Sequence, residues 1–280
     1  MDAATRAAVE AWADASIVDA AELDGGEVGS VHRVDLGDDR RVVAKTAEAD
    51  LRIEARMLRH LAEHGLAVPA VHHAAEDLLV IAYVDGESRI TPAVERDLAD
   101  RLAALHANSA PTFGFPFDTL TGELDLPNPR EADWSTFFGE HRLGYMADRA
   151  EKEGLLPANG AERVDALVDD LPALLDHDPE PSLIHGDVWR ANLLTDGESV
   201  RTFLDPACYY ADPEVELAYV DWTDTGGEAF FERYRARAGI PHGAASRRPV
   251  YRLLPLLVHL RHFGSEYLDP VRETLAELGY

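Results

Sequence analysis

Three polar residues with fixed spacing could carry out chemistry. In the run 183–194 (LIHGDVWRANLL), Asp187 stands five residues before Asn192, with apolar residues on either side, and Asp205 follows the apolar run 200–204. Phosphoryl transfer to an alcohol needs a carboxylate to orient and deprotonate the hydroxyl, and oxygen ligands for Mg²⁺ on the phosphates. Singly, each residue could cap a turn. Together, at the spacing of a kinase, they predict Asp187 as the base and Asn192 and Asp205 as metal ligands.

A lysine in the first half supplies the next part. Lys45 ends the apolar run 42–45 (VVAK), which is close to the V-A-I-K pattern of kinase strands that direct a lysine at the α- and β-phosphates of ATP. Of the 26 basic residues, only Lys45 and Lys152 are lysines. A retained lysine indicates a need for a compact ammonium rather than a planar guanidinium. Glu54, on the following predicted helix, is placed to pair with Lys45, although it could also be a solvated acid.

Two further segments are predicted to bind the nucleotide. Gly26, Gly29 and Ser30 belong to a glycine-bearing turn 16–20 residues before Lys45, where backbone N–H groups could cover phosphates. The segment 81–84 is predicted to be a hinge that contacts adenine through backbone atoms of Ala82 and Val84. The glycine pattern by itself is weak evidence for a nucleotide-binding loop. Its position before Lys45 is what supports the prediction.

The elements that must position these residues fall into two groups. We expect a helix over 3–22, strands over 27–36 and 40–46, an amphipathic helix over 51–64, and strands over 70–73 and 78–83. After residue 86 most segments read as helices, interrupted by a β-rich patch at 182–204. The predicted helices are 94–106, 134–150, 161–175, 214–221, 228–238 and 251–263. The pattern predicts an α+β, bilobal protein-kinase-like fold, with a small β-rich N-lobe (1–85) and a larger, mainly helical C-lobe (86–280).

The composition limits the partners. The 52 acidic and 26 basic residues give a formal net charge of −26, which repels nucleic acid and anionic membranes, so we expect neither as a partner. An acid-rich, lysine-poor surface also suggests a halophilic source, because concentrated salt screens the self-repulsion. No signal sequence or membrane span is recognisable, and the lone Cys208 fits a reducing compartment, so we expect a cytoplasmic protein. We expect a monomer, and we assign Cys208 no redox role.

The motif around Asp187 resembles that of the fructosamine kinase (ketosamine 3-kinase) family, which is related to aminoglycoside phosphotransferases and choline kinases. His-Gly-Asp and the asparagine five residues on are shared by this whole group. The more specific features are Trp189, the run 205–218 (DPACYYADPEVELA), the pattern 113–129 with its Phe-Gly-Phe and Pro-Asn-Pro, the run 134–143 (WSTFFGEHRL), and the run 256–264 (LLVHLRHFG). The resemblance extends from about residue 25 to residue 278.

The resemblance implies an ATP- and Mg²⁺-dependent kinase that phosphorylates the 3-hydroxyl of ketosamines, the adducts formed when sugars glycate amines. The phosphorylated adduct is labile, so the implied role is deglycation of a free or protein-bound amine. Ribulosamine and erythrulosamine adducts are the expected substrates, with fructosamines as the alternative. Trp189 would offer an aromatic face to the sugar, and His259 would contact sugar hydroxyls. Either could instead be a packed core residue.

Several alternatives remain at this stage. The family's usual Ser-Gly after the tryptophan is Arg190-Ala191 here, which leaves the substrate size open. Glu214 and Glu216 could bind a substrate amine or form ion pairs with the arginine-rich C-terminal helix, which we favour. A kinase for another small alcohol, such as an aminoglycoside or choline, is the second hypothesis. A pseudokinase serving as a binding module is the third, although the lysine, the base and the metal ligands are all present.

Overall fold

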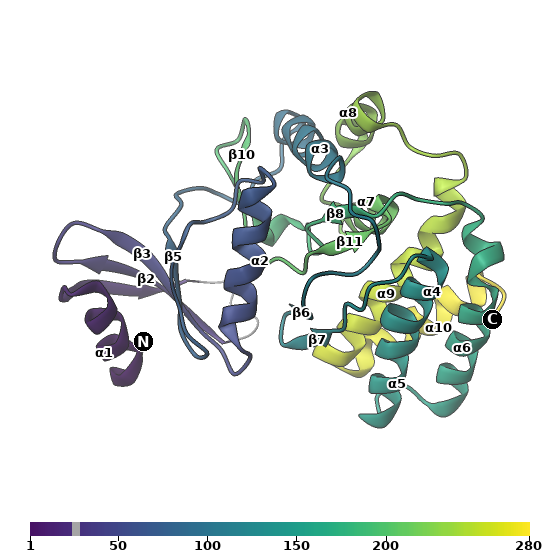
Figure 1. The fold of residues 1–280 in the computed structure, drawn as a ribbon, viewed down its shortest axis with the longest axis horizontal. Coiled ribbons are helices and arrows are strands. Elements are labelled where there is room, and N and C mark those ends of the chain that lie inside the picture. Colours follow the sequence, from purple (N-terminus) through teal and green to yellow (C-terminus); the bar gives the residue numbers. More distant parts are fainter. Residues whose placement is uncertain (24–28) are drawn as a thin grey trace.

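The computed structural model describes residues 1–23 and 29–280, so the predicted nucleotide-binding residue Gly26 lies outside the described residues. Figure 1 shows a β-sheet region at one end of the molecule and a helical region at the other. The elements of the first region are α1 (Ala3–Ala13), β1 (Ile17–Glu22), β2 (Ser30–Leu36), β3 (Arg41–Thr46), α2 (Leu51–Glu63), β4 (Val71–Ala74) and β5 (Leu79–Ala82).

The remaining elements are mostly helical. They are α3 (Pro92–His106), β6 (Thr119–Thr121), β7 (Leu124–Leu126), α4 (Trp134–Phe138), the π-helix η1 (Gly139–Gly144), α5 (Tyr145–Lys152), α6 (Ala158–Leu175), β8 (Ser182–Ile184), the 3₁₀-helix η2 (Arg190–Asn192), β9 (Leu193–Thr195), β10 (Val200–Phe203), β11 (Tyr209–Ala211), α7 (Pro213–Trp222), α8 (Glu228–Ala238), α9 (Ala244–Phe263), the 3₁₀-helix η3 (Ser265–Tyr267) and α10 (Leu268–Glu277). The predicted α+β architecture, with a small β-rich region followed by a larger, mainly helical one, is confirmed. The change from sheet to helices falls between Ala82 and Pro92, and the proposed division at residue 85 stays a prediction.

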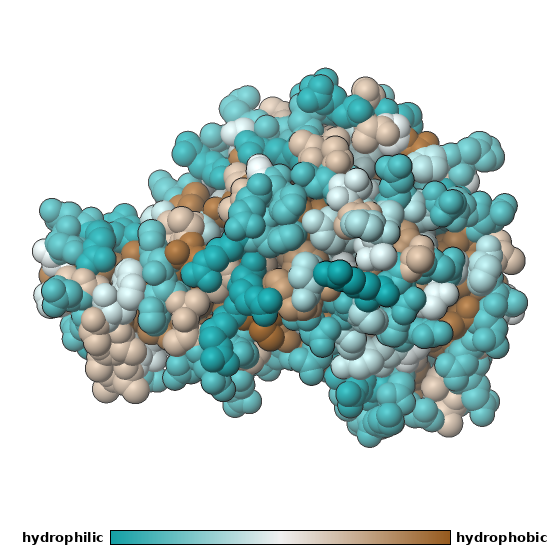
Figure 2. All heavy atoms as spheres, viewed as in Figure 1, coloured by the Kyte–Doolittle hydropathy of each residue, from teal (hydrophilic) through white to brown (hydrophobic). Residues whose placement is uncertain are grey.

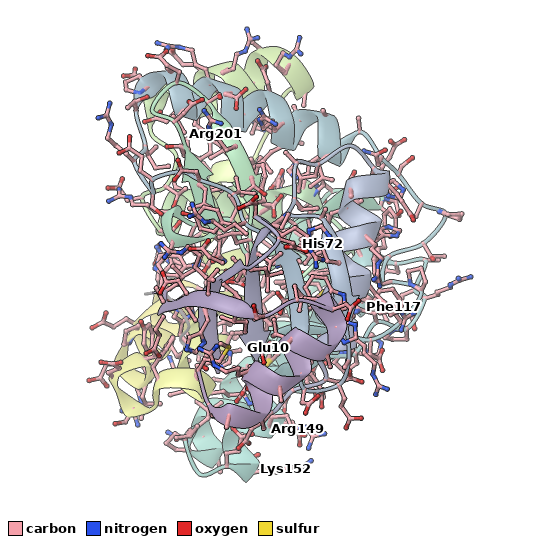
Figure 3. All side chains as sticks on the ribbon, turned by 90° about the vertical axis from the view of Figure 1, so that its left-hand side faces the viewer. Glu10, His72, Phe117, Arg149, Lys152 and Arg201 are labelled. Carbon is pink, nitrogen blue, oxygen red and sulfur yellow. The ribbon has the colours of Figure 1, made fainter. Side chains whose placement is uncertain are left out.

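The N-terminal sheet has the strand order β1-β2-β3-β5-β4, and every neighbouring pair is antiparallel. The predicted helix over 3–22 is wrong, because α1 ends at Ala13 and 17–22 form β1. Asp14 adopts a left-handed conformation with φ 51°, which ends the helix. The helix covers one face of the sheet, where Val9 packs with Val34 and Val42. Figure 3 views this end of the molecule, with Glu10 of α1 and His72 of β4 toward the viewer.

Helix α2 lies between the sheet and the helical region (Figure 1). Leu51, Ala55 and Leu58 pack with the sheet residues Leu79 and Ile81. The neighbouring face of the helix carries Met57 and Leu61 into the main core of the helical region. The amphipathic pattern therefore serves two partners, and α2 is fixed from both sides.

The helical region is built around two short strand pairs that carry the predicted catalytic loop. Strand β8 pairs with β11, and β9 pairs with β10, both antiparallel. Helices α3 and α8 pack together, as do α7 and α9. The β6–β7 hairpin and α10 were not predicted, and α9 begins at residue 244 rather than 251.

Hydrophilic residues cover most of the face shown in Figure 2, in keeping with the acidic composition. Val18 and Phe263 are the exposed large hydrophobic residues of the described chain. Among the described residues, none of the helices has the length and apolar character needed to cross a membrane.

Candidate active site

Strand β8 leads directly into the loop that carries Asp187. The strand is fully buried, and its last residue, Ile184, lies opposite Tyr209 of β11. Gly186 then adopts φ +87°, and a Cβ at this position would lie 2.2 Å from the carbonyl oxygen of Ala207. Only glycine fits both constraints. The turn fixes the backbone of Asp187, whose N–H donates to Nδ1 of His185 at 3.3 Å.

The structure brings Asp187 and Asn192 together. The Asn192 side-chain amide donates to the Asp187 carboxylate at 2.7 Å and to the Asp187 carbonyl at 3.0 Å. The backbone N–H of Asn192 donates to the Trp189 carbonyl at 3.0 Å, which closes η2. The five-residue spacing thus forms a closed loop in which the asparagine orients the carboxylate.

Lys45, Glu54 and Asp205 meet where the sheet, α2 and the helical region converge. The Lys45 ammonium lies 2.8 Å from the Glu54 carboxylate and 2.7 Å from the Asp205 carboxylate. Burial disfavours the ammonium, but the two carboxylates outweigh burial and raise the pKa of Lys45, which stays charged. The predicted pairing of Glu54 with Lys45 is present. The 160-residue separation of Lys45 and Asp205 is bridged by one ion pair.

The residues predicted to contact the nucleotide flank this ion pair. Gly29 has φ +82°, and a Cβ there would lie 2.1 Å from the Thr46 carbonyl oxygen, so the turn requires glycine. Ser30 lies opposite Thr46 in the β2–β3 pairing, one position from Lys45. The Ala82 N–H donates to the Ala70 carbonyl at 2.8 Å, so an adenine contact from Ala82 would need another atom. Val84 is half-buried, just beyond the end of β5.

The oxygen atoms of Asn192 and Asp205 are suited to Mg²⁺, which prefers carboxylate and carbonyl oxygens. The Leu204 N–H donates to the Asn192 carbonyl at 2.9 Å, so the residue before Asp205 is tied to the backbone of Asn192. The Asp205 side chain is 46% exposed and binds Lys45 through one oxygen. The carboxylate of Asp205 and the amide oxygen of Asn192 are donors of the kind that this ion takes.

Glu216 holds the backbone of the predicted catalytic loop, a role that the sequence does not reveal. Its carboxylate accepts the Gly186 N–H at 2.6 Å and the His185 N–H at 3.3 Å, and it pairs with Nε2 of His106 at 2.8 Å. Burial opposes the charged carboxylate, but the bonds from His106 and the loop lower the pKa of Glu216. Tyr234 closes the network through a 2.7 Å contact with Nδ1 of His106.

The expected ion pairs with the C-terminal helix form for Glu214 only. The Glu214 carboxylate binds the Arg247 guanidinium of α9 with both oxygens, at 2.8 and 2.6 Å. For Glu216 the expectation is wrong, because its partners are a histidine of α3 and two backbone N–H groups. Two acids two residues apart on the first turn of α7 point to different neighbours, and the sequence offers no signal for which does which.

A pocket opens in the helical region beside Asp187. Its lining includes Asp187, Gly186, Glu216, Tyr219 of α7 and His259 of α9. The ring of His259 lies 5.2 Å from that of Trp222, and its Nδ1 contacts the Pro255 carbonyl at 2.6 Å. Burial lowers the pKa of His259, so its ring is neutral at pH 7.

Other residues near the loop take less central positions. Trp189 is half-buried and is not among the residues lining the pocket. Arg190 is exposed, and its N–H donates to Thr225 Oγ1 at 3.1 Å. Cys208 is fully buried, and burial raises its thiol pKa, so it is an unreactive core residue. Arg142 and Tyr209 also line the pocket, and neither was predicted as a site residue.

The comparison with protein families settles which family carries this site. The model of the fructosamine kinase family matches residues 1–279. The chain belongs to the fructosamine kinase family. This membership confirms the recognised resemblance and the predicted enzyme class, an ATP-dependent phosphotransferase.

Relatives and solved structures agree with this membership. The Escherichia coli protein named "Probable ketoamine kinase YniA" is 33% identical over 183 residues, covering 65% of this chain and 62% of the relative, so the match spans less than two thirds of that relative. The crystal structure of a "putative fructosamine-3-kinase" from Thermobifida fusca superposes with a TM-score of 0.86 at 27% identity, covering 97% of this chain and 96% of that chain. An aminoglycoside phosphotransferase, APH(4)-Ia in complex with AMP-PNP and hygromycin B, shares the fold, with a TM-score of 0.66 at 22% identity and coverage of 93% and 92%.

Proposed function

We propose that this protein transfers the γ-phosphate of ATP to the 3-hydroxyl of a ketosamine, with ribulosamine or erythrulosamine adducts preferred over fructosamines. The observation that carries the proposal is the position of Asp187. Its carboxylate lines the pocket and is oriented by Asn192, whose backbone is tied to the segment leading to Asp205 and Lys45. A hydroxyl in the pocket would therefore face the base on one side and the nucleotide site on the other.

In this mechanism Asp187 accepts the proton of the acceptor hydroxyl as the oxygen attacks the γ-phosphorus, and the bond from the γ-phosphorus to the bridging oxygen breaks so that ADP leaves. Lys45 neutralises charge on the α- and β-phosphates, and Glu54 holds the ammonium in place. Gly29 and Ser30 would cover the phosphates with their backbone, and Val84 would contact adenine. We assign the same covering role to Gly26 on its sequence position alone.

Asn192 and Asp205 would hold Mg²⁺ through their free oxygens. When bound, the ion neutralises charge that develops on the phosphates. On the acceptor side, the neutral His259 ring would contact sugar hydroxyls. Trp189 stands outside the pocket lining, so its contact with the sugar would require a substrate that extends beyond the pocket.

The product implies a role in deglycation, because phosphorylation at the 3-hydroxyl makes the adduct labile and regenerates the amine. We propose that the protein is a monomer and lies in the cytoplasm. ATP is available in that compartment, and Cys208 is expected to stay reduced there. We also propose that it works in concentrated salt, because a formal net charge of −26 destabilises the folded chain when it is not screened. A melting temperature that does not rise between 0.1 and 2 M KCl would contradict the salt proposal.

The test of the function is ATP consumption with Mg²⁺ in high salt, using ribulose-lysine, fructose-lysine, choline and kanamycin as acceptors. We expect turnover with the ketosamines and highest kcat/KM with ribulose-lysine. Turnover with choline or kanamycin alone would overturn the substrate proposal and leave the kinase fold intact. ATP binding with no turnover of any acceptor would favour a pseudokinase.

A further inference from the structure

Helix α2 carries a row of side chains that the proposed mechanism does not use. Arg56, His60 and His64 are spaced four residues apart, so they lie on one side of the helix. Glu54, which pairs with Lys45, belongs to the same helix. A contact that fixes this row therefore also fixes the position of the helix that carries Glu54.

The ring of His60 packs on two aromatic residues of the helical region, Phe115 and Tyr210, which we call the aromatic pair. Its centroid lies 4.7 Å from that of Phe115 and 6.1 Å from that of Tyr210, edge to face in both cases. Its Nε2 also contacts the Tyr210 hydroxyl at 3.4 Å. Burial lowers the pKa of His60, so the ring is neutral at pH 7 and packs as an aromatic group. This contact differs in kind from the ion pairs around Lys45.

A second contact lies one helical turn before His60. The Arg56 guanidinium lies over the ring of Phe117, 3.5 Å from its centroid, and this ring packs edge to face on Phe115 at 4.8 Å. Phe117, labelled in Figure 3, therefore lies on the same side of α2. The face of an aromatic ring attracts a cation without a carboxylate. Two successive turns of α2 are thus held by the segment 115–117, to which the proposed mechanism gives no role.

The aromatic pair is tied to both halves of the candidate active site. Tyr210 follows Asp205 in the same segment and lies in β11, which pairs with β8, the strand that leads to Asp187. Gly114, the residue before Phe115, exchanges two backbone hydrogen bonds with Tyr210, at 3.1 and 2.9 Å. A shift of α2 against the aromatic pair would therefore change its position relative to both aspartates.

The backbone around Gly114 explains the Phe-Gly-Phe run. Gly114 has φ +96°, and a Cβ there would lie 2.0 Å from the Pro129 carbonyl oxygen, so glycine is required. The Phe115 N–H donates to the Asn128 carbonyl at 3.3 Å. The Phe-Gly-Phe and Pro-Asn-Pro runs therefore pack against each other, and this packing holds the Phe115 ring beside α2.

The proposed reaction needs a fixed relation between the two sides. In-line transfer requires the attacking oxygen, the phosphorus and the leaving oxygen to be aligned. The Lys45–Asp205 ion pair crosses between the two sides, but its members can change partners when the nucleotide binds. The aromatic pair contains none of the residues assigned to ATP or Mg²⁺, so ligand binding need not disturb it.

We propose that the contact between His60 and the aromatic pair aligns the γ-phosphate, held on the sheet side, with Asp187 on the helical side. This inference rests on the proposed function, because it assigns the contact to the alignment step of that reaction. His60 is not among the residues that line the pocket, so it is a positioning residue. Loss of its ring would let the two sides shift while each still binds its own ligand. A misplacement of about 1 Å can cost about 100-fold in rate.

The test compares His60→Ala with His60→Phe and Arg59→Ala. Phenylalanine keeps a ring on the aromatic pair, and Arg59 is an exposed neighbour on the same helix. With an acceptor that the wild type phosphorylates, we expect His60→Ala to lower kcat about 10-fold, with the Kd of MgATP within about 2-fold of wild type. His60→Phe and Arg59→Ala should keep kcat within about 2-fold. The kcat of each variant is expressed per molecule that binds MgATP, so partial unfolding does not imitate the effect.

A second variant tests the partner of His60. Phe115→Leu should also lower kcat, and the double variant with His60→Ala should lose no more than the more impaired single variant, because both changes remove one contact. Losses that multiply in the double variant would show that the two residues act independently, which would contradict the inference.

The outcomes separate the inference from the function. If the wild type phosphorylates no acceptor, the proposed function and this inference fail together. If the wild type is active and His60→Ala is equally active per MgATP-binding molecule, the inference alone fails. It also fails if His60→Phe is as impaired as His60→Ala, because a ring on the aromatic pair is then not what matters. Weaker MgATP binding with an unchanged kcat would assign the contact to the phosphates and contradict alignment.

Discussion

The two halves of the candidate active site are held together in different ways. On the phosphate side, Lys45, Glu54 and Asp205 come from three separate elements and meet through charged side chains, one of them 46% exposed. On the acceptor side, the loop of Asp187 is held through its backbone by the buried Glu216, which is 1% exposed. The ion pairs of the proposed phosphate side can therefore rearrange when ligands bind, whereas Asp187, the proposed base, is fixed in advance.

The comparison indicates how the work of the site is divided. The charged groups that we propose adjust to the bound nucleotide are joined by ion pairs, which can exchange partners. Asp187, which we propose removes the proton, is preorganised by a glycine turn and a buried network, so little reorganisation would be needed at the reaction step. Breaking each half should therefore give a different signature.

On the phosphate side, the largest effect is expected from Lys45→Met. Loss of the ammonium leaves Glu54 and Asp205 without their shared counter-ion, and nothing replaces its charge on the phosphates. We expect kcat/KM for ATP to fall about 100- to 1,000-fold. Lys152→Met, at the other lysine, removes only an exposed pair with Asp148 and should leave activity and stability unchanged. Activity within 5-fold of wild type in Lys45→Met would rule out its role at the phosphates.

A substitution at Gly186 should disrupt the backbone turn that holds the acceptor side. An alanine there meets a positive φ and a Cβ that would lie 2.2 Å from the Ala207 carbonyl oxygen. We expect Gly186→Ala to cost about 3 kcal/mol or more of unfolding free energy and to abolish turnover. Gly154 has φ +75° with nothing within 4 Å of a Cβ, so Gly154→Ala should cost only about 1 kcal/mol. Denaturant unfolding of both variants measures the difference, and equal costs would show that the close contact is unimportant.

Glu216→Gln is a milder test of the buried network that holds the Asp187 loop. The amide can still accept one N–H bond, but it loses the charge that pairs with His106. We expect kcat to fall about 10-fold, with KM for ATP within 2-fold of wild type. Asp221→Asn, at an exposed acid of the same helix, should not change either constant. A rise in KM for ATP without a change in kcat would contradict the separation of the two halves.

Acid should lower the stability of the fold, partly through His185 on the acceptor side, with the smallest of these effects. Burial lowers the pKa of His185 from its ordinary 6.5, so the unfolded chain binds more protons just below that pH and stability is lost as pH falls. Lys45, whose pKa is raised, gains or loses no proton in this range. We expect the melting temperature to be steady from pH 8 to 7 and to fall by a few degrees toward pH 5.5. His185→Gln should melt lower at pH 7 but show a shallower fall, and an unchanged slope would assign the acid sensitivity elsewhere.

Much of the fold and of the reacting set could be predicted because local patterns report them. The apolar periodicity of 51–64 predicted α2, and the spacing of Asp187, Asn192 and Asp205 reports a loop whose geometry is set within a few residues. The error at 3–22 arose because an alanine-rich run favours helix up to Asp14, while the pairing of 17–22 with β2 is a tertiary contact. Intrinsic propensity could not reveal that partner.

The supporting contacts were harder to predict for the same physical reason. Glu216 reaches His106 across 110 positions, and Arg142 meets its partners through an irregular turn of helix. Glu214 and Glu216 look alike in sequence, and only packing decides which one binds Arg247. Buried polar networks depend on long-range geometry, so they become visible only in the folded chain.

The most direct test of the account is Asp187→Asn, assayed for ketosamine-dependent turnover and for ATP binding in the same preparation. The substitution keeps the shape of the side chain and removes the base. We expect a loss of kcat of about 100- to 10,000-fold, with ATP affinity and melting temperature unchanged. Retained turnover, or a loss of ATP binding as large as that of Lys45→Met, would contradict a preorganised base that is separate from the phosphate side.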